Sequence, residues 1–194
     1  IPICMLVQQI NKIHVLTKEC DKLANNIGYL TSSKTPEHQE LYTPYYAVEP
    51  IVKYIPKSYR IWCPFDAEWS SFYQTFRENG FDVIRSHIDE GKDLIISNPP
   101  FNIKDQILER LYNLNKPFAV LLPLNTLQGK TRYKYFKNGI QILSFDQRIG
   151  FHNRQNMNST IEGSPFATAY FCKDFLPNDL IVEKLEKYEK GLLD

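Results

Sequence analysis

This chain of 194 residues lacks a long apolar run, a strong net charge and any clustering of cysteine or histidine. No stretch approaches the roughly 20 apolar residues that cross a bilayer, so the pattern predicts no membrane span. The formal net charge is +1, and any nucleic-acid site would therefore have to be a local basic patch. Residues 1–7 are too short and too poorly flanked for a signal peptide, from which we expect a cytoplasmic protein.

The cysteines and histidines number four each, and both are scattered along the chain. Neither residue type has the spacing of a metal-binding motif, so we expect no metal site. Cys63 and Cys172 lie in strand-like runs and are predicted to be buried free thiols.

What the chain does contain is a short aliphatic run that stops abruptly. Residues 93–97 read as a buried strand of a parallel sheet, and Asn98 ends it. Pro99 and Pro100 then fix a turn that cannot continue the ladder, and Phe101 follows directly. Ligands of open α/β sheets bind beyond the carboxyl ends of strands. The pattern therefore places an amide, a rigid diproline and an aromatic ring where a ligand would bind.

Alternating strand and helix patterns predict an α/β fold, a three-layer sandwich around a mostly parallel sheet. We expect strands at residues 59–63, 81–88, 93–97, 116–124, 140–145 and 164–172, and helices at 44–54, 69–79, 103–114 and 179–192. Thr43 is the expected N-cap of the helix that begins at Pro44. Residues 41–194 form the expected main domain, and residues 1–40 an accessory helix followed by a polar linker.

Few residues separate the strand that ends at Ile88 from the one that begins at Asp93. A parallel crossover needs about a dozen residues, so a further helix and strand cannot fit there. Either a loop is missing from the sequence between Asp89 and Asp93, or the sheet is shortened.

The segment Asn98-Pro99-Pro100-Phe101 resembles the Asn/Asp-Pro-Pro-Tyr/Phe motif of S-adenosylmethionine-dependent amino-methyltransferases, above all the adenine-specific enzymes of phage and prophage type. The resemblance implies a Rossmann-like class I methyltransferase fold with one antiparallel strand near the C-terminus, here the last strand at residues 164–172. It also implies S-adenosylmethionine as cofactor and the N6 amine of adenine in DNA as acceptor. The lone pair of that amine is delocalised into the ring. Two acceptors, the Asn98 side-chain oxygen and the Pro99 carbonyl, would orient the amine, and Phe101 would stack on a base that has left its helix.

The same resemblance implies the cofactor site. Tyr42, Thr43 and Pro44 match a segment that holds the methionine end of the cofactor, and Asn98 also contacts it. The turn Cys63-Pro64-Phe65-Asp66 matches the family turn Asp-Pro-Phe-x-Gly-x-Gly only at its Pro and Phe. Ala67 and Trp69 stand where the family has glycine, so we expect Asp66 and Glu68 to rebuild the site. Asp89 is the expected ribose-binding acid after the second strand.

Basic residues interleaved with aromatic ones suit a nucleic-acid strand, because charges meet phosphates while rings meet bases. The candidates are Lys130, Arg132, Tyr133 and Lys134, followed by Arg148, His152 and Arg154. A solvated amphipathic helix is the alternative interpretation of the first group. The second group belongs to a polar loop that should share an edge of the sheet with Asn98.

Three functions stay open at this level. The first is a DNA adenine methyltransferase. The second has the same chemistry on another substrate, because related motifs occur in methyltransferases of RNA guanine amines and protein glutamine amides. The third is a non-catalytic nucleic-acid-binding subunit that has lost the cofactor. No insertion is large enough for a target-recognition domain, so either sequence specificity is low, or a protein partner, a homodimer or the small loops would lend it.

Overall fold

The computed structural model describes residues 41–85, 92–160 and 166–193. The predicted accessory helix and linker at 1–40, and Asp89, lie outside these ranges. Two sheets are present in the described chain. β1 (Leu41–Tyr42) pairs antiparallel with β7 (His152–Asn153). The main sheet has seven strands in the order β3-β2-β4-β5-β8-β6-β9. These are β2 (Arg60–Trp62), β3 (Asp82–Ile84), β4 (Leu94–Ser97), β5 (Phe118–Pro123), β6 (Gln141–Phe145), β8 (Thr168–Lys173) and β9 (Leu180–Glu183).

The strand directions agree with the expected mostly parallel sheet. β3, β2, β4 and β5 pair in parallel, and so do β6 and β9. β8 is antiparallel to both β5 and β6, as expected for the predicted last strand. The fold is thus α/β with one reversed strand in the sheet, an arrangement compatible with a Rossmann-like fold.

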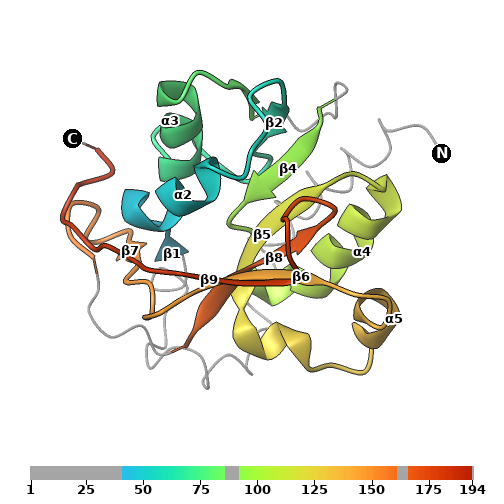
Figure 1. Ribbon diagram of the computed structural model, residues 1–194. Coiled ribbons are helices and arrows are strands. Elements are labelled where there is room, and N and C mark those ends of the chain that lie inside the picture. The colour runs from blue at the N-terminus through green and yellow to red at the C-terminus, as the bar shows by residue number, and fades with distance from the viewer. Residues whose placement is uncertain (1–40, 86–91, 161–165, 194) are drawn as a thin grey trace.

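The helices lie on both sides of the sheet, as Figure 1 shows. α2 (Tyr45–Val52) and α3 (Ser71–Glu78) cover one face, and α4 (Lys104–Leu114) covers the other. The short η2 (Phe101–Ile103), η3 (Leu124–Leu127) and α5 (Tyr133–Phe136) complete the set. None of the helices within the described ranges is long and apolar enough to span a bilayer.

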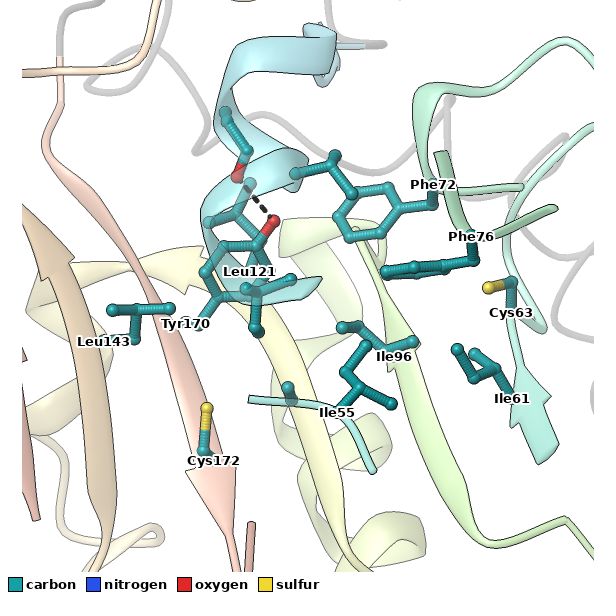
Figure 2. Packing of buried hydrophobic residues seen from close by; sticks show 14 of the residues in the cluster. Ile55, Ile61, Cys63, Phe72, Phe76, Ile96, Leu121, Leu143, Tyr170 and Cys172 are labelled. Atoms are coloured by element: carbon teal, nitrogen blue, oxygen red, sulfur yellow. Dashed lines mark hydrogen bonds between the residues drawn. The ribbon is translucent and has the colours of Figure 1, made fainter. Parts of the chain in front are cut away.

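The central strands are buried on both faces, as near-continuous aliphatic runs predict. Alternate residues of β4 point to opposite cores: Ile96 packs with α2 and α3, and Ile95 packs with α4. Tyr170 of β8 lies in the first core, where its hydroxyl donates to the Ala47 carbonyl at 2.9 Å (Figure 2). Cys63 and Cys172 are buried free thiols, as predicted.

Local signals placed several helix ends correctly. Ser70 caps α3, where its hydroxyl accepts from the Tyr73 amide at 3.2 Å. Gly80 follows α3 with φ of 80°, and Asn115 ends α4 in the left-handed conformation with φ of 50°. Thr43 does not cap α2, which is a correction. Pro44 occupies the cap position, and no side chain there bonds to the helix amides.

The predicted helix at residues 179–192 is wrong. Residues 180–183 instead form β9, which pairs in parallel with β6. The run Leu180-Ile181-Val182 suits a strand, and β6 offers an unpaired edge there. Glu183 of β9 forms an ion pair with Lys53 at 2.6 Å and accepts from the Tyr54 hydroxyl.

β3 and β4 flank β2, and the described chain has no strand beyond β3. The described residues thus form a shortened sheet. The mass of the intact protein tests whether a loop is missing from the sequence, because a mass of 22.8 kDa would contradict a missing loop.

The two buried tyrosine hydroxyls give a matched test of this packing. Tyr170→Phe leaves the Ala47 carbonyl without its donor and should lower the free energy of unfolding by about 1–2 kcal/mol. The Tyr112 hydroxyl is buried without a partner in the described chain, so Tyr112→Phe should be neutral or stabilising. Urea unfolding of both variants measures the difference. Equal destabilisation by the two changes would contradict this reading of the core.

Candidate active site

A cavity of about 390 Å³ opens where β1, the turn after β2, the start of α3 and the chain after β4 converge. Its size lies in the range of small-molecule sites. The described chain holds no group of side chains that could bind a metal ion. The lining residues are Leu41, Tyr42, Thr43, Phe65, Asp66, Ala67, Trp69, Ser70, Ser71, Phe72, Asn98, Pro99, Pro100, Phe101 and Leu192.

Asn98 lies at the carboxyl end of β4, and its amide is oriented by one bond. Its Nδ2 donates to the Leu41 carbonyl at 2.9 Å. A carbonyl only accepts, so the NH₂ group must face Leu41 and the side-chain oxygen must face away. That oxygen is buried and has no hydrogen-bond partner in the described chain. A buried acceptor without a donor is costly, and because Asn98 lines the cavity, a donor on a bound ligand would satisfy it.

The diproline that follows Asn98 lines the cavity with both of its residues. The ring of Phe101 lies edge-on to Phe166, with centroids 5.7 Å apart. The four residues of the predicted acceptor motif thus come together on one wall.

Thr43 brings a second buried polar group to the cavity. Its backbone carbonyl accepts from the Ser71 hydroxyl at 2.7 Å, which joins the chain before α2 to the start of α3. Its own Oγ1 is buried and has no partner among the described residues. Thr43 and Asn98 thus line the same cavity and each has one unsatisfied polar atom, which a polar ligand such as the expected cofactor would satisfy.

Asp66 lies between the turn and β4. It accepts a short hydrogen bond from the Ser97 hydroxyl. Burial raises the pKa of the carboxyl from 3.8 to about 7, and hydrogen bonds from Ser97 and Ser70 and the charge of Arg85 only partly oppose this. A group poised near neutrality in a cavity is typical of a functional site.

The other predicted cofactor residues do not line the cavity. Cys63 is fully buried in the core, and burial raises the pKa of its thiol well above the ordinary value. Pro64 is half-buried and Pro44 is buried, and neither is a lining residue. Glu68 is exposed and forms an ion pair with Arg85 at 3.5 Å.

Sequence reasoning missed three kinds of lining residue. Trp69 was noted only as a lost glycine, yet its ring lines the cavity in edge contact with Tyr42. Ser70 and Ser71, which line the wall where α3 begins, had only the ordinary signal of a helix cap. Leu192 also lines the cavity, although the sequence predicted a helix for its segment and contained no local pattern that indicated this position.

The first group of predicted nucleic-acid residues lies at and before α5, beside α4, and none of them lines the cavity. Arg132 bonds to Asp105 at 2.9 Å and to the Thr126 carbonyl at 2.7 Å, so its charge is already engaged. Lys134 lies 3.7 Å from Glu109 of α4. Lys130 and Tyr133 are exposed beside them, and α5 lies far from β1 in Figure 1.

The second group lies on the connection that contains β7, and β7 pairs with β1, whose Leu41 and Tyr42 line the cavity. His152 is a correction, since its side chain is fully buried and Nδ1 lies 3.0 Å from the Ser159 carbonyl. Burial lowers the pKa of that ring, which suits a neutral structural histidine rather than a phosphate contact. Arg148 and Arg154 are exposed on the same connection.

Asp66 predicts a pH dependence of stability. The folded protein holds a proton on this carboxyl between about pH 4 and pH 7, where the unfolded chain has lost it. Its stabilising contribution is therefore complete below about pH 4 and lost as the pH rises through about 7. Asp66→Asn removes this dependence, so the variant should gain stability relative to the parent between pH 5 and pH 8. Urea unfolding at both values measures it, with the exposed Asp179→Asn as control. An unchanged difference at the two pH values would contradict the assignment.

Comparisons with known proteins add the fold context. No protein-family model matches the sequence, and no curated protein is similar to it. Among solved structures, the chain is similar to a modification subunit of a putative type I restriction enzyme from Vibrio vulnificus YJ016, with a TM-score of 0.43 and 11% identity. The match covers 93% of this chain and 54% of that subunit, so this chain spans about half its length. At this level the likeness supports no conclusion about activity.

Proposed function

We propose that this chain is an S-adenosylmethionine-dependent methyltransferase that methylates the exocyclic N6 amine of adenine in DNA. The observation that carries the proposal is the Asn98 side-chain oxygen, which is buried, unpartnered and turned away from Leu41 on a cavity wall. An acceptor held in this way is suited to receive a hydrogen bond from an amine. The resemblance of residues 98–101 to the amino-methyltransferase motif supports the same assignment.

The roles of the chain's own residues follow from this geometry. Asn98 and the Pro99 carbonyl accept the two hydrogens of the amine and localise its lone pair toward the methyl group. Pro99 and Pro100 keep the carbonyl in place, because their rings restrict the backbone. Phe101 offers a ring face to the base. When bound, the cofactor supplies an electrophilic methyl group, and Thr43 and Asp66 would hold its polar end.

The turn after β2 is where the proposal departs most from the family pattern. Ala67 and Trp69 replace glycines and line the cavity, so the cofactor has to be accommodated without a glycine backbone. Isothermal titration with S-adenosylhomocysteine tests this half of the site. If S-adenosylhomocysteine does not bind, the result favours a non-catalytic nucleic-acid-binding subunit. If it binds, that interpretation is excluded.

Asn98→Ala is the direct test of the acceptor. Loss of the oriented oxygen should lower the rate of methyl transfer by about 10²-fold or more. The measurement is incorporation of labelled methyl groups from S-adenosylmethionine into DNA, with RNA and protein assayed in parallel. The control is Asn102→Ala, an exposed amide four residues on, which should keep full activity.

Two results would count against the proposal. If Asn98→Ala and Asn102→Ala lose methyl-transfer activity equally, Asn98 does not act as the acceptor of the amine hydrogen bond. Label that enters RNA or protein but not DNA would keep the chemistry and change the substrate.

The placement of Arg148 and Arg154 supports a DNA contact beside the cavity, and α5 does not share that position. Arg154→Ala should weaken DNA binding several-fold at low salt and reduce the salt dependence by about one phosphate contact. Lys134→Ala, on the α4 side, should leave both unchanged. Fluorescence anisotropy with a labelled duplex over a salt series measures both variants. A larger effect of Lys134→Ala would relocate the DNA surface to α5.

A further inference from the structure

Two aromatic rings meet at a right angle on the cavity wall. The centroids of Tyr42 and Trp69 lie 4.9 Å apart, and their planes are inclined by 83°. Both residues line the cavity, one from β1 and the other from the turn before α3. In this edge-to-face contact the edge of one ring lies on part of the other ring's face, so one open face and the uncovered part of the second form a corner that can accept a cation.

The charges around the corner favour the same kind of ligand. No Lys, Arg or His appears among the described residues that line the cavity. Asp66, which lines it too, is an acid. Arg85 acts on that carboxyl from outside the lining and is itself paired with Glu68 at 3.5 Å. The cavity thus combines aromatic walls with no basic side chain, and the Asp66 carboxyl, whose pKa is about 7, can ionise in the presence of a cation.

We infer that the Tyr42–Trp69 corner binds the positively charged centre of the cofactor and so distinguishes the sulfonium donor from its neutral thioether product. The inference rests on the proposed function, and it deepens that proposal by naming what the cofactor site selects. It also gives Trp69 a role at a position where the family has glycine. A glycine backbone lets a ligand approach closely whatever its charge, whereas an indole face attracts a cation more strongly than a neutral group.

Selection of the charged form has a kinetic benefit. Transfer of the methyl group converts the sulfonium into a thioether and abolishes the positive charge. The attraction to the rings then disappears, so the thioether dissociates more readily and the site favours binding of the next sulfonium donor. A cation against a desolvated ring face gains enough for a preference of about five- to thirtyfold.

The test compares three ligands by isothermal titration on the intact chain: S-adenosylmethionine, S-adenosylhomocysteine, and sinefungin, whose ammonium group replaces the methylsulfonium. The parent should bind both charged ligands about five- to thirtyfold more tightly than the thioether. Trp69→Leu should reduce this preference to less than about twofold while thioether affinity changes little, and Trp69→Phe should lie between. Phe65→Leu, another aromatic of the lining, is the control and should weaken all three ligands equally.

Intrinsic fluorescence adds a second readout. The chain has two tryptophans, and Trp62 is buried in the core beside α4. Sinefungin should change the emission of the parent, and that change should be absent in Trp69→Phe. Circular dichroism melting confirms that each variant is folded.

The outcomes separate the two proposals. Equal affinity of the parent for charged and neutral ligands would overturn the inference and leave the proposed function intact. Equal loss of all three ligands in Trp69→Leu would also overturn it, because the ring would then contribute packing alone. Failure of the parent to bind any of the three would overturn both.

Discussion

Leu94–Ser97 of β4 is buried on both faces of the sheet, and this constraint shapes the site. A backbone enclosed in that way satisfies its polar groups through its neighbours β2 and β5, and only its end is free to offer a side chain to a ligand. Asn98 is the first residue beyond the strand, and the diproline prevents the ladder from continuing past it. The residue proposed to bind the acceptor amine, Asn98, is therefore the first one beyond the buried strand.

The bond from Asn98 to the Leu41 carbonyl carries that constraint into the rest of the cavity. It joins residues 57 positions apart and ties the end of β4 to β1. β1 in turn pairs with β7, and Thr43 is held to α3 through Ser71. The Asn98 amide thus has two parts with different roles. Its nitrogen joins two walls of the cavity, and its oxygen has no hydrogen-bond partner in the described chain. A substitution of Asn98 would therefore change both the positions of the cavity walls and the acceptor that they hold.

The turn after β2 shows how a motif can lose its signature residues while its location in the fold remains. Cys63 belongs to the core, and Glu68 faces outward toward Arg85. Asp66 alone among the acids of the turn reaches the cavity, where Ser97 and Ser70 hold it. Trp69 takes space that glycine would leave open, so the recognition of a ligand here would depend on ring faces and one carboxyl group.

The amino-acid sequence by itself determined the features that rest on local pattern. These include the buried strand that stops at Asn98, the helix that ends at Asn115, the buried thiols and the mostly parallel α/β sheet. Periodicity and turn chemistry report which face of an element is buried, and that information is contained within a few residues.

Features that depend on contacts between residues distant in the sequence were decided only by the tertiary structure. Residues 180–183 became a strand because β6 offered an edge, although the charges after them suited a helix. His152 was drawn into the interior by the pairing of β7 with β1, and Arg132 was engaged by Asp105 of α4. Tyr42 and Trp69 met at a corner because two separate segments converge on the end of one buried strand. Each of these contacts joins groups whose separation in sequence carries no local signal, so the packing of the whole sheet had to bring them together.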